Sequence, residues 1–396
     1  MTAGEARPLR VFVVAGEESG DALAAPLMLA LAARKGGARF VGVGGDRMRA
    51  AGLESLFPME DLTAMGFAAV IGKLPTILRR MRQTVEAIIA DPPDVVVLVD
   101  SPDFTHRVAA RLRARRPDIP IVKYVAPTVW AWRSGRARAL APIVDHVLAL
   151  LPFEPKVMAE LGGPPTRYVG HSLSEERAEL RPSAEEAERR RASPPLLLVL
   201  PGSRGQEIRM MAPLFGKALA ILVDRGHRFE LVLPTPPRLK GRIEALTADW
   251  SVTPRIVTDP AAKRAAFRSA YAALAASGTV TLELALARIP MVGAYRLPNW
   301  EAIIAWFALK TRTILLANIV LGRQVIPEVM QLDCTPERLA DALEPILREG
   351  PAREAQFAAF DEIERVLDTG GRTSAEIAAE VVEAAAAGRN RPAGLS

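Results

Sequence analysis

The chain has 396 residues, of which 49% are hydrophobic and 24% are charged, and its formal net charge is +6 at pH 7. This length favours two domains over one core, and the apolar content excludes a disordered protein. The single cysteine, Cys334, excludes a disulfide framework, the four histidines show no metal-ligand spacing, and the mild positive charge favours anionic ligands without indicating nucleic acid.

The N-terminal segment contains too many charged side chains for a signal peptide. No apolar run reaches the roughly 18 residues that a membrane-spanning helix needs. We therefore expect a cytoplasmic protein whose contact with a membrane, if it makes one, is peripheral.

The first part of the chain alternates apolar runs with amphipathic segments, which is typical of doubly wound α/β domains. A strand is predicted at residues 9–14, followed by a glycine-bracketed loop and a helix over residues 22–33. Further strands are predicted at residues 40–43, 95–99, 121–125 and 146–150. Together these elements predict a Rossmann-like domain over residues 1–174.

A second series of the same kind follows a charged helical connector over residues 175–195. Its predicted strands are at residues 196–200, 229–232, 254–257, 272–275 and 290–294. A second Rossmann-like domain is thus expected over residues 196–334, with C-terminal helices over residues 335–388 and a disordered tail over residues 389–396. Two such domains facing each other would form a central cleft, where α/β proteins normally bind ligands.

The loops of the first domain supply carboxylates. Asp100 follows the apolar run at 95–99, so it is expected at the carboxyl end of a buried strand, where it can act as a general base on a hydroxyl group. Alternatively, Asp100 or Asp103 caps the next helix. His171, near the domain junction, is the rival base. The residues that can orient an acceptor sugar are Glu17, Ser19, Asp21, Asp103 and His171.

The most informative motif follows the apolar run at 196–200 and precedes an amphipathic helix. Its glycines let backbone N–H groups approach an anion, while the helix N-terminus and an arginine fork favour negative charge. The motif predicts a phosphate site, with an ordinary turn carrying a solvated arginine as the alternative. Its residues are Gly202, Ser203, Arg204 and Gly205.

A second corner of this type holds Ser277, Gly278 and Thr279, with Glu283 one turn along the next helix. A carboxylate there can accept hydrogen bonds from both hydroxyls of a ribose, or it can be a solvated helix side chain. Taken together, the two corners favour a nucleotide diphosphate. No Asp-x-Asp clamp follows a strand, so we expect Arg204 and helix dipoles, without a metal ion, to neutralise the diphosphate.

Three segments combine apolar or aromatic residues with basic neighbours, which together favour a lipid surface, although core packing explains any one of them. The first begins at Met65, the second surrounds Trp130, and the third holds Trp300, Trp306 and Phe307. The residues predicted to meet lipid are Met65, Phe67, Val70, Leu74, Leu78, Arg79, Arg80, Trp130 and Trp132.

In this order, the motifs resemble the lipid-A-disaccharide synthase family, which are inverting glycosyltransferases of the two-domain GT-B architecture. The resemblance covers nearly the whole chain. It is carried by residues 15–21, 42–48, 65–66, 100–104, 124–133, 151–154, 170–171, 201–205, 276–283, 290–292 and 318–323. Thr105, Ala126 and Gln324 depart from the residues that are common at their positions in the family.

The resemblance implies that UDP-2,3-diacylglucosamine donates its sugar to 2,3-diacylglucosamine 1-phosphate (lipid X), giving a β-1,6-linked disaccharide 1-phosphate and UDP. It also implies a peripheral enzyme at the cytoplasmic face of the inner membrane, often a homodimer, and no cofactor. Asp100 matches the essential acid of the family and Arg204 its essential arginine. Other family motif positions are occupied by Glu17, Glu283, Asn318 and Arg323, of which the last three are assigned to the donor.

Three alternatives stay open at this point. A nucleotide-sugar epimerase of the same architecture would isomerise a UDP-sugar without an acceptor, but it leaves the apolar and basic surface unexplained. A non-catalytic scaffold would bind UDP without turnover, and the acid and the arginine argue against it. The nearest competitor is a transferase with a polyprenyl-linked acceptor.

Overall fold

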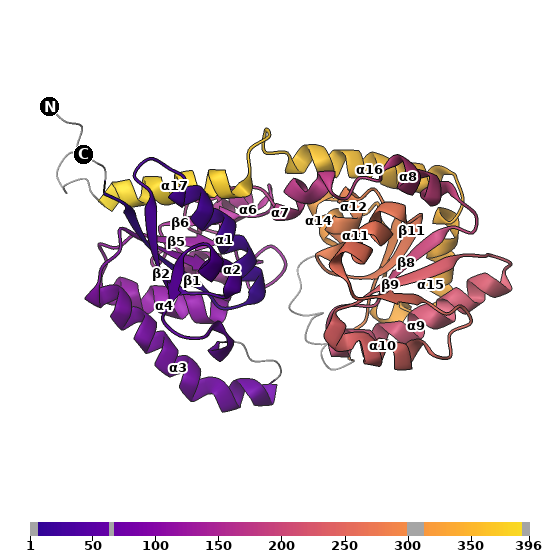
Figure 1. Ribbon diagram of the computed structural model, residues 1–396, viewed down its shortest axis with the longest axis horizontal. Coiled ribbons are helices and arrows are strands. Elements are labelled where there is room, and N and C mark those ends of the chain that lie inside the picture. Colours follow the sequence, from indigo (N-terminus) through magenta and orange to yellow (C-terminus); the bar gives the residue numbers. More distant parts are fainter. Residues whose placement is uncertain (1–6, 63–66, 299–312, 390–396) are drawn as a thin grey trace. The chain divides into compact units, whose positions relative to one another are not determined.

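The computed structural model describes residues 7–62, 67–298 and 313–389. It divides into two compact units (Figure 1): Met1–Ser172 with Thr369–Ser396, and Leu173–Asp368. Each unit contains one parallel sheet with helices packed on it. The chain therefore has the predicted α/β fold of two Rossmann-like domains.

The first sheet has the strand order β3-β2-β1-β4-β5-β6-β7. Its strands are β1 (Leu9–Ala15), β2 (Ala38–Val43), β3 (Leu53–Ser55), β4 (Val95–Val99), β5 (Ile121–Tyr124), β6 (His146–Ala149) and β7 (Thr166–Tyr168). The five predicted strands are confirmed, and the short outer strands β3 and β7 are additional. The helices of this part are α1 (Glu18–Ala32), α2 (Asp46–Ala50), α3 (Phe67–Ala90), α4 (Pro102–Arg115), α5 (Gly135–Leu140) and α6 (Glu154–Glu160).

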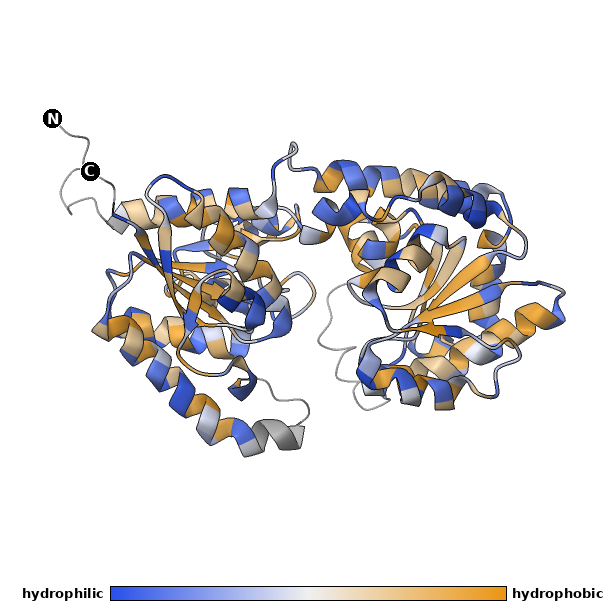
Figure 2. Cartoon of the chain, viewed as in Figure 1, coloured by the Kyte–Doolittle hydropathy of each residue, from blue (hydrophilic) through white to orange (hydrophobic). Residues whose placement is uncertain are grey.

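The second sheet has the strand order β10-β9-β8-β11-β12-β13. Its strands are β8 (Leu196–Leu200), β9 (Glu230–Pro234), β10 (Arg255–Val257), β11 (Ala272–Ala276), β12 (Met291–Tyr295) and β13 (Glu328–Met330). Hydrophobic residues concentrate on the strands of both sheets (Figure 2), as expected for sheets covered on two faces. The remaining described helices are α7 (Ser172–Glu175), α8 (Ala184–Arg191), α9 (Gly205–Asp224), α10 (Lys240–Thr247), α11 (Pro260–Ser269), α12 (Val280–Leu286), α14 (Leu316–Leu321), α15 (Pro336–Leu343), α16 (Pro351–Leu367) and α17 (Ser374–Arg389).

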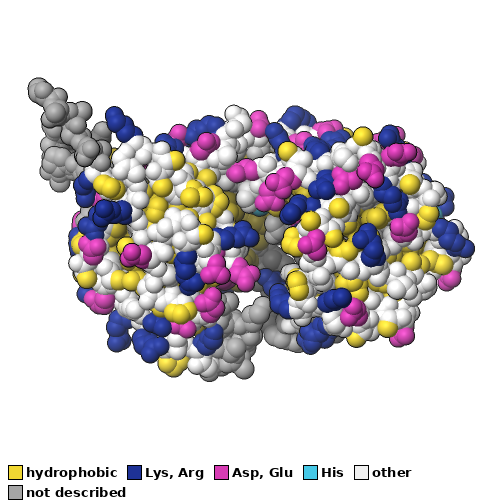
Figure 3. All heavy atoms as spheres, in the orientation of Figure 1, with side chains coloured by type: hydrophobic (Ala, Val, Ile, Leu, Met, Phe, Trp, Pro, Cys, Tyr) yellow, Lys and Arg dark blue, Asp and Glu magenta, His cyan; other side chains and the backbone are white. Residues whose placement is uncertain are grey.

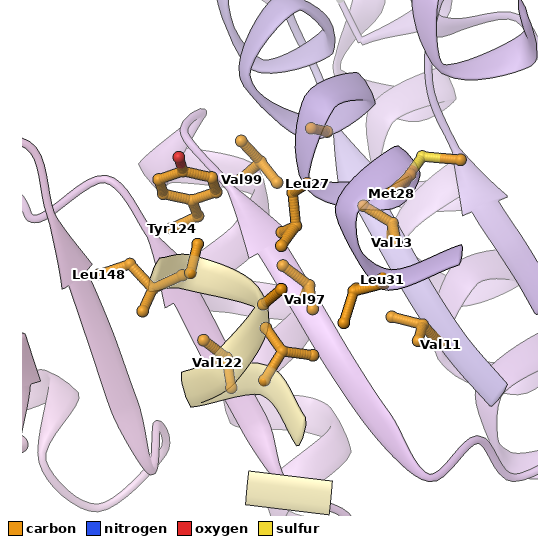
Figure 4. Close-up of a cluster of buried hydrophobic side chains, with 14 of the residues drawn as sticks. Val11, Val13, Leu27, Met28, Leu31, Val97, Val99, Val122, Tyr124 and Leu148 are labelled. Atoms are coloured by element: carbon orange, nitrogen blue, oxygen red, sulfur yellow. The ribbon is translucent and has the colours of Figure 1, made fainter. Parts of the chain in front are cut away.

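Helix α17 covers the first sheet, although α16, which precedes it, belongs to the second unit. Ile377, Val381 and Val382 of α17 belong to the same buried cluster as Leu27 of α1 and Val122 of β5. Figure 4 shows this cluster, with the C-terminal helix in pale yellow beside the strands of the first sheet. The chain therefore crosses from one unit to the other twice.

Both sheets reverse their strand order at one point, between β1 and β4 and between β8 and β11. Ala15 pairs with Val99 at the first reversal, and Leu200 pairs with Ala275 at the second. Neighbouring strands lie about 4.8 Å apart, so the loops that follow each pair start side by side. Ligands of open α/β sheets bind at these switch points.

Candidate active site

The turn between β4 and α4 carries the predicted general base, Asp100. Asp100 and Ser101 have left-handed backbone conformations, with φ angles of 46° and 41°. Such conformations cost a non-glycine residue on the order of 1–3 kcal/mol and cluster at active sites. Ser101 is the N-cap residue of α4, and no side chain caps the helix. The alternative in which Asp100 or Asp103 caps the helix is therefore wrong.

Asp100 is half-buried, and its two carboxylate oxygens differ in their hydrogen bonds. Ser19 Oγ donates a hydrogen bond of 3.0 Å to Asp100 Oδ2. Among the residues that the structure describes, none donates a hydrogen bond to Oδ1. A carboxylate oxygen without a donor can accept the proton of an incoming hydroxyl group.

Two buried side chains hold the main chain of this turn. Lys123 Nζ donates a hydrogen bond of 2.5 Å to the Asp100 carbonyl oxygen. Thr105 Oγ1 lies 2.8 Å from the same oxygen and 3.0 Å from the Ser101 carbonyl oxygen. The Asp100 N–H donates to the carbonyl oxygen of Tyr124 at 3.0 Å. Every polar main-chain group of Asp100 is thus satisfied from within the protein.

The loop after β1 lies against this turn. A Cβ atom on Gly16 would lie 2.7 Å from Ser101 Oγ, so the close approach of the two loops requires glycine. Glu17 and Ser19 are exposed beside it. The structure therefore brings Glu17, Ser19 and Asp100 to one edge of the sheet, as the sequence predicts.

Asp21 has a different task from the one predicted. Its side chain is buried, with 5% of the residue exposed, which closes it to a sugar. Its carboxylate accepts hydrogen bonds from three backbone N–H groups at the start of α2, and we assign it to holding that helix. The donors are Gly45 at 2.8 Å, Arg47 at 3.0 Å and Met48 at 3.1 Å.

The remaining acid and the rival base also lie in the first unit. The Asp103 side chain is 89% exposed and lies 3.6 Å from the guanidinium of Arg136. His171 is buried, and burial lowers the pKa of its imidazole to about 4. His171 is thus more deeply buried than Asp100, which is half-buried.

The corner between β8 and α9 already surrounds an anionic group of its own chain. Glu207, in the first turn of α9, accepts hydrogen bonds from the backbone N–H groups of Ser203 and Arg204, at 3.2 and 3.3 Å. It also accepts one from Arg204 Nη1 at 3.1 Å. Gly202 has a φ of 117°, which turns the chain toward this carboxylate. The donors that the sequence assigns to a phosphate thus converge on one carboxylate.

A second guanidinium lies at the same corner. A Cβ atom on Gly205 would overlap Nη1 of Arg242, which comes from α10 and is exposed. The Arg204 side chain is itself 73% exposed. Two exposed guanidinium groups at the N-terminus of a long helix make this corner electropositive.

The second corner follows β11, the neighbour of β8. Gly278 and Thr279 are exposed there, whereas Ser277 Oγ donates to the Ile314 carbonyl oxygen at 2.8 Å. Glu283 is held by Lys263, whose Nζ lies 2.8 and 3.1 Å from the two carboxylate oxygens. A ribose at Glu283 would have to share this carboxylate with the lysine.

Asn318 and Arg323, which the family resemblance assigns to the donor, are engaged within the protein. Asn318 is fully buried, and its Oδ1 accepts hydrogen bonds from the N–H groups of Val325 and Ile326, each at 3.0 Å. This burial gives Asn318 the role of shaping the loop that follows α14, rather than contacting the donor. Arg323 forms two hydrogen bonds, of 2.7 and 2.6 Å, to the carboxylate of Glu362.

Part of the predicted lipid surface is exposed on α3. Leu74 and Leu78 are 44% and 42% exposed, one helical turn apart, and Arg79 is exposed beside them. Figure 3 shows basic and apolar side chains over this region. Arg80 instead turns inward and pairs with Asp61, at 2.7 Å. Met65, the side chains of Phe67 and Val70, and the segment of Trp300, Trp306 and Phe307 lie outside the described residues.

The two tryptophans of the predicted lipid surface are half-buried and bonded within the chain. Trp130 Nε1 donates to Glu154 Oε1 at 3.2 Å, and its ring meets Phe153 edge-on at 5.6 Å. Trp132 Nε1 donates to Thr128 Oγ1 at 3.0 Å, and the Arg133 guanidinium lies 4.4 Å from its ring. These contacts explain both rings by packing rather than by an open lipid surface.

Two negative findings concern the described part of the chain. None of its helices is long and apolar enough to cross a bilayer. It also contains no group of three or more His, Cys, Asp or Glu side chains that could hold a metal ion.

Sequence reasoning missed the residues that hold the functional groups in place. Lys123 stands inside an otherwise apolar strand segment, and this placement is the one signal that could have identified it. Glu207 has the spacing of a helix N3 residue, which predicts contact with the N-terminal amides. Lys263 and Arg242 are distant in sequence from the groups they meet, and no local pattern indicates those contacts.

Comparison with known proteins finds relatives over nearly the whole chain. The model of the family described as lipid-A-disaccharide synthetase matches residues 11–382. The chain is 55% identical to a lipid-A-disaccharide synthase of Rhodopseudomonas palustris, over 94% of this chain and 95% of the relative. It is 53% identical to the enzyme of the same name from Bradyrhizobium diazoefficiens, with the same coverage.

Solved structures agree in fold. UDP-GlcNAc 2-epimerase from Neisseria meningitidis, bound to UDP-GlcNAc, has a TM-score of 0.63 at 12% identity, covering 96% of this chain and 100% of that one. A glycosyltransferase from Rickettsia africae has a TM-score of 0.60 at 11% identity, covering 98% and 100%. At these identities the likeness concerns the fold alone, which is the GT-B fold with two Rossmann-like domains.

Proposed function

The chain belongs to the lipid-A-disaccharide synthetase family and is a hexosyltransferase of lipid A biosynthesis, and from that membership we propose the reaction and the residues that perform it. The donor is UDP-2,3-diacylglucosamine and the acceptor is 2,3-diacylglucosamine 1-phosphate (lipid X). The products are the β-1,6-linked disaccharide 1-phosphate and UDP. The observation that carries this proposal is Asp100, a half-buried residue on a left-handed turn at the switch point of the first sheet, whose Oδ1 receives no hydrogen bond from the described residues.

Asp100 acts as the general base. Its Oδ1 takes the proton from the 6-hydroxyl of the acceptor while that oxygen attacks the anomeric carbon of the donor. The bond from this carbon to the diphosphate breaks on the opposite side, so an α-linked donor gives a β-linked product. Ser19 supports the step, because its hydrogen bond to Oδ2 fixes the orientation of the carboxylate.

Arg204 binds the diphosphate that leaves. Its guanidinium and the N–H groups of Ser203 and Arg204 converge on the Glu207 carboxylate, and a phosphate would take the place of this carboxylate. Arg242 adds positive charge at the same corner. Glu283 accepts the ribose hydroxyls, with Lys263 beside it. Because these cationic groups can neutralise the developing charge, the reaction proceeds without a divalent metal ion.

The reaction is tested with purified protein in detergent and EDTA, supplied with UDP-2,3-diacylglucosamine and lipid X. Mass spectrometry should detect the disaccharide 1-phosphate, which would establish the donor, the acceptor and the independence from metal together. Product that forms only after Mg²⁺ is added would contradict metal independence. Isomerisation of the UDP-sugar in the absence of an acceptor would instead indicate an epimerase.

Membrane contact is a second part of the proposal. The exposed residues Leu74, Leu78 and Arg79 of α3 bind the inner membrane at its cytoplasmic face, where anionic lipid attracts the arginine and the leucines enter the interface. Co-sedimentation with phosphatidylglycerol vesicles should fall when both leucines are changed to serine. Leu29→Ser, at a leucine 58% exposed on α1, is the matched control and should bind like the wild type.

The family resemblance further supports a homodimer as the working form. Light scattering coupled to size-exclusion chromatography measures its mass directly. A mass close to 42.7 kDa, that of a single chain, would contradict the dimer.

A further inference from the structure

A buried lysine lies directly beneath the acid of the proposed reaction. Lys123 is on β5, next to β4 in the sheet, and it is only 1% exposed. Its Nζ lies 2.5 Å from the Asp100 carbonyl oxygen and 3.4 Å from that of Tyr124. A lysine in such a position needs an explanation, because removing an ammonium group from water is costly unless it is paired.

The surroundings of Lys123 do not explain it as part of a structural ion pair. No carboxylate among the described residues lies within salt-bridge distance of its ammonium. The charged or titratable groups that act on this region are Asp100 on the β4–α4 turn, Asp103 and His106 on α4, and Arg136 on α5. Burial lowers the pKa of Lys123 to about 7, and the Asp100 carboxylate opposes this shift.

The hydrogen bond from Lys123 is donated to Asp100, whose backbone conformation is unfavourable for a non-glycine residue. Asp100 and Ser101 are consecutive non-glycine residues with left-handed conformations. A turn of this kind reverts to an ordinary conformation unless neighbouring groups hold it. Lys123 donates a hydrogen bond of 2.5 Å to the turn, and Thr105 contacts the same carbonyl oxygen.

We propose that Lys123 is a positioning residue for the glycosyl transfer: it holds the main chain of Asp100 in the conformation that presents the carboxylate to the acceptor hydroxyl. This inference rests on the proposed function. Lys123 touches neither substrate and acts only through Asp100.

The test compares Lys123→Met, which keeps an apolar side chain about as long as the lysine stem but removes its donor and its charge, with Val122→Ala. Val122 is the neighbouring residue of β5, is buried on the opposite face of the sheet, and reports general loss of packing. Lys123→Met should lower kcat by roughly 10- to 100-fold, because small misplacements of reacting groups have effects of this size. The KM for each substrate and the Kd for UDP should stay within twofold.

Two readouts separate positioning from general destabilisation. In Lys123→Met the loss should fall on kcat and not on KM, because the carboxylate is misplaced while both substrates still bind. Amide hydrogen exchange of the peptide spanning residues 100–105 should become faster. Val122→Ala should lower the melting temperature without either change. Lys123→Gln, which retains a donor, should fall between Lys123→Met and the wild type.

Equal kcat in Lys123→Met and wild type, or equal loss in Lys123→Met and Val122→Ala, would overturn the proposal. If the wild type forms no disaccharide, the proposed function fails, and the exchange measurement still decides whether Lys123 holds the turn. Unchanged exchange at residues 100–105 in Lys123→Met would then overturn the positioning role.

Discussion

The turn that carries Asp100 in the first unit (the acid turn) and the β8–α9 corner that carries Arg204 in the second unit (the arginine corner) are held in place by different kinds of contact. Asp100 is fixed through its main chain, which bonds to the buried side chains of Lys123 and Thr105. Arg204, in contrast, is exposed and is fixed by the carboxylate of Glu207. A substrate can bind to Asp100 without disturbing what holds it, whereas an anionic ligand at Arg204 must replace the group that holds it.

This difference matches the two tasks. A general base works best when it needs no rearrangement at the moment of reaction, and a buried frame provides this. A binding corner must exchange partners in every cycle. The Arg204 side chain is 73% exposed, although that of Glu207 is only 14% exposed, so a phosphate can reach the guanidinium and compete with the carboxylate for it. Ion pairs between exposed groups contribute only about 0–1 kcal/mol.

The largest effect is expected from the acid turn. Asp100→Asn should lower kcat by roughly 10²–10⁴-fold, because the amide cannot accept the acceptor proton. Calorimetry should find UDP binding unchanged, since the donor corner lies in the other unit. Asp118→Asn, at an exposed acid beyond α4, is the control and should retain activity. Normal turnover in Asp100→Asn would remove Asp100 from the mechanism.

The arginine corner should show its effect in binding. Arg204→Ala should weaken the Kd for UDP by roughly 10- to 150-fold, as expected for the loss of a charged hydrogen bond of about 1.5–3 kcal/mol. Arg204→Lys should recover part of the affinity, because a lysine keeps the charge and loses the planar fork. Arg209→Ala, at an exposed position on the same helix, should leave the Kd within twofold. Equal affinity in Arg204→Ala and wild type would contradict the assignment.

A smaller effect of opposite sign, a lower Kd for UDP, tests whether phosphate replaces the Glu207 carboxylate at Arg204. Glu207→Gln removes the negative charge that occupies the corner, so UDP should bind about two- to fivefold more tightly. The comparison is calorimetric titration of both proteins at low salt, where the ion pair is strongest. Weaker binding in Glu207→Gln would mean that the carboxylate serves the bound state and not the free one.

The smallest expected effect concerns the pH dependence of stability, which should differ between the two units because different titratable groups are buried in them. In the first unit burial lowers the pKa values of His106 and His171 to about 4 and raises that of Glu154 to about 7. In the second unit burial raises the pKa of Cys334 to about 11 and lowers that of Arg190 to about 10, both far from neutral pH. The stability of the first unit should therefore respond to mild acid.

The two contributions in the first unit have opposite signs. Below pH 6.5 the unfolded chain binds protons at the histidines that the native protein binds only near pH 4, so stability falls as the pH falls through this range. The native Glu154 binds its proton near pH 7 and the unfolded chain near 4.5, so it adds stability as the pH falls. Glu154→Gln removes this offset, and its melting temperature should decline more steeply than that of the wild type between pH 6.5 and 4.5. If the melting temperatures of Glu154→Gln and wild type change equally with pH, Glu154 does not provide this offset.

Most of the fold could be predicted because strong patterns specify it. The runs at residues 95–99 and 196–200 are uninterrupted and apolar, and the structure places strands at these same residues. Strands β3, β7 and β13 have three residues each and partly exposed side chains, so no periodicity marks them. The packing of α17 on the first sheet depends on contacts between distant residues, which a local pattern does not record.

In the candidate site, too, some residues could be predicted from local patterns, whereas others depend on tertiary contacts. Asp100 and Arg204 could be predicted because each follows a recognisable strand and opens a helix. The roles of Asp21 and Asn318 could not, because their backbone partners are chosen by tertiary structure. Lys123 was missed because a charged residue in a strand ordinarily indicates an exposed edge, and only the sheet order shows that β5 is central.

Because α17 packs on the first sheet but lies near the end of the chain, the first domain stays incomplete until α17 has been synthesised. Residues 173–368 must be translated before α17 exists, which takes roughly 10–40 s at about 5–20 residues per second. During this interval Leu27 and Val122 lack the helix that covers them in the finished protein. The nascent first domain therefore emerges from the ribosome with an apolar face open to chaperones, and the arrival of α17 ends that exposure.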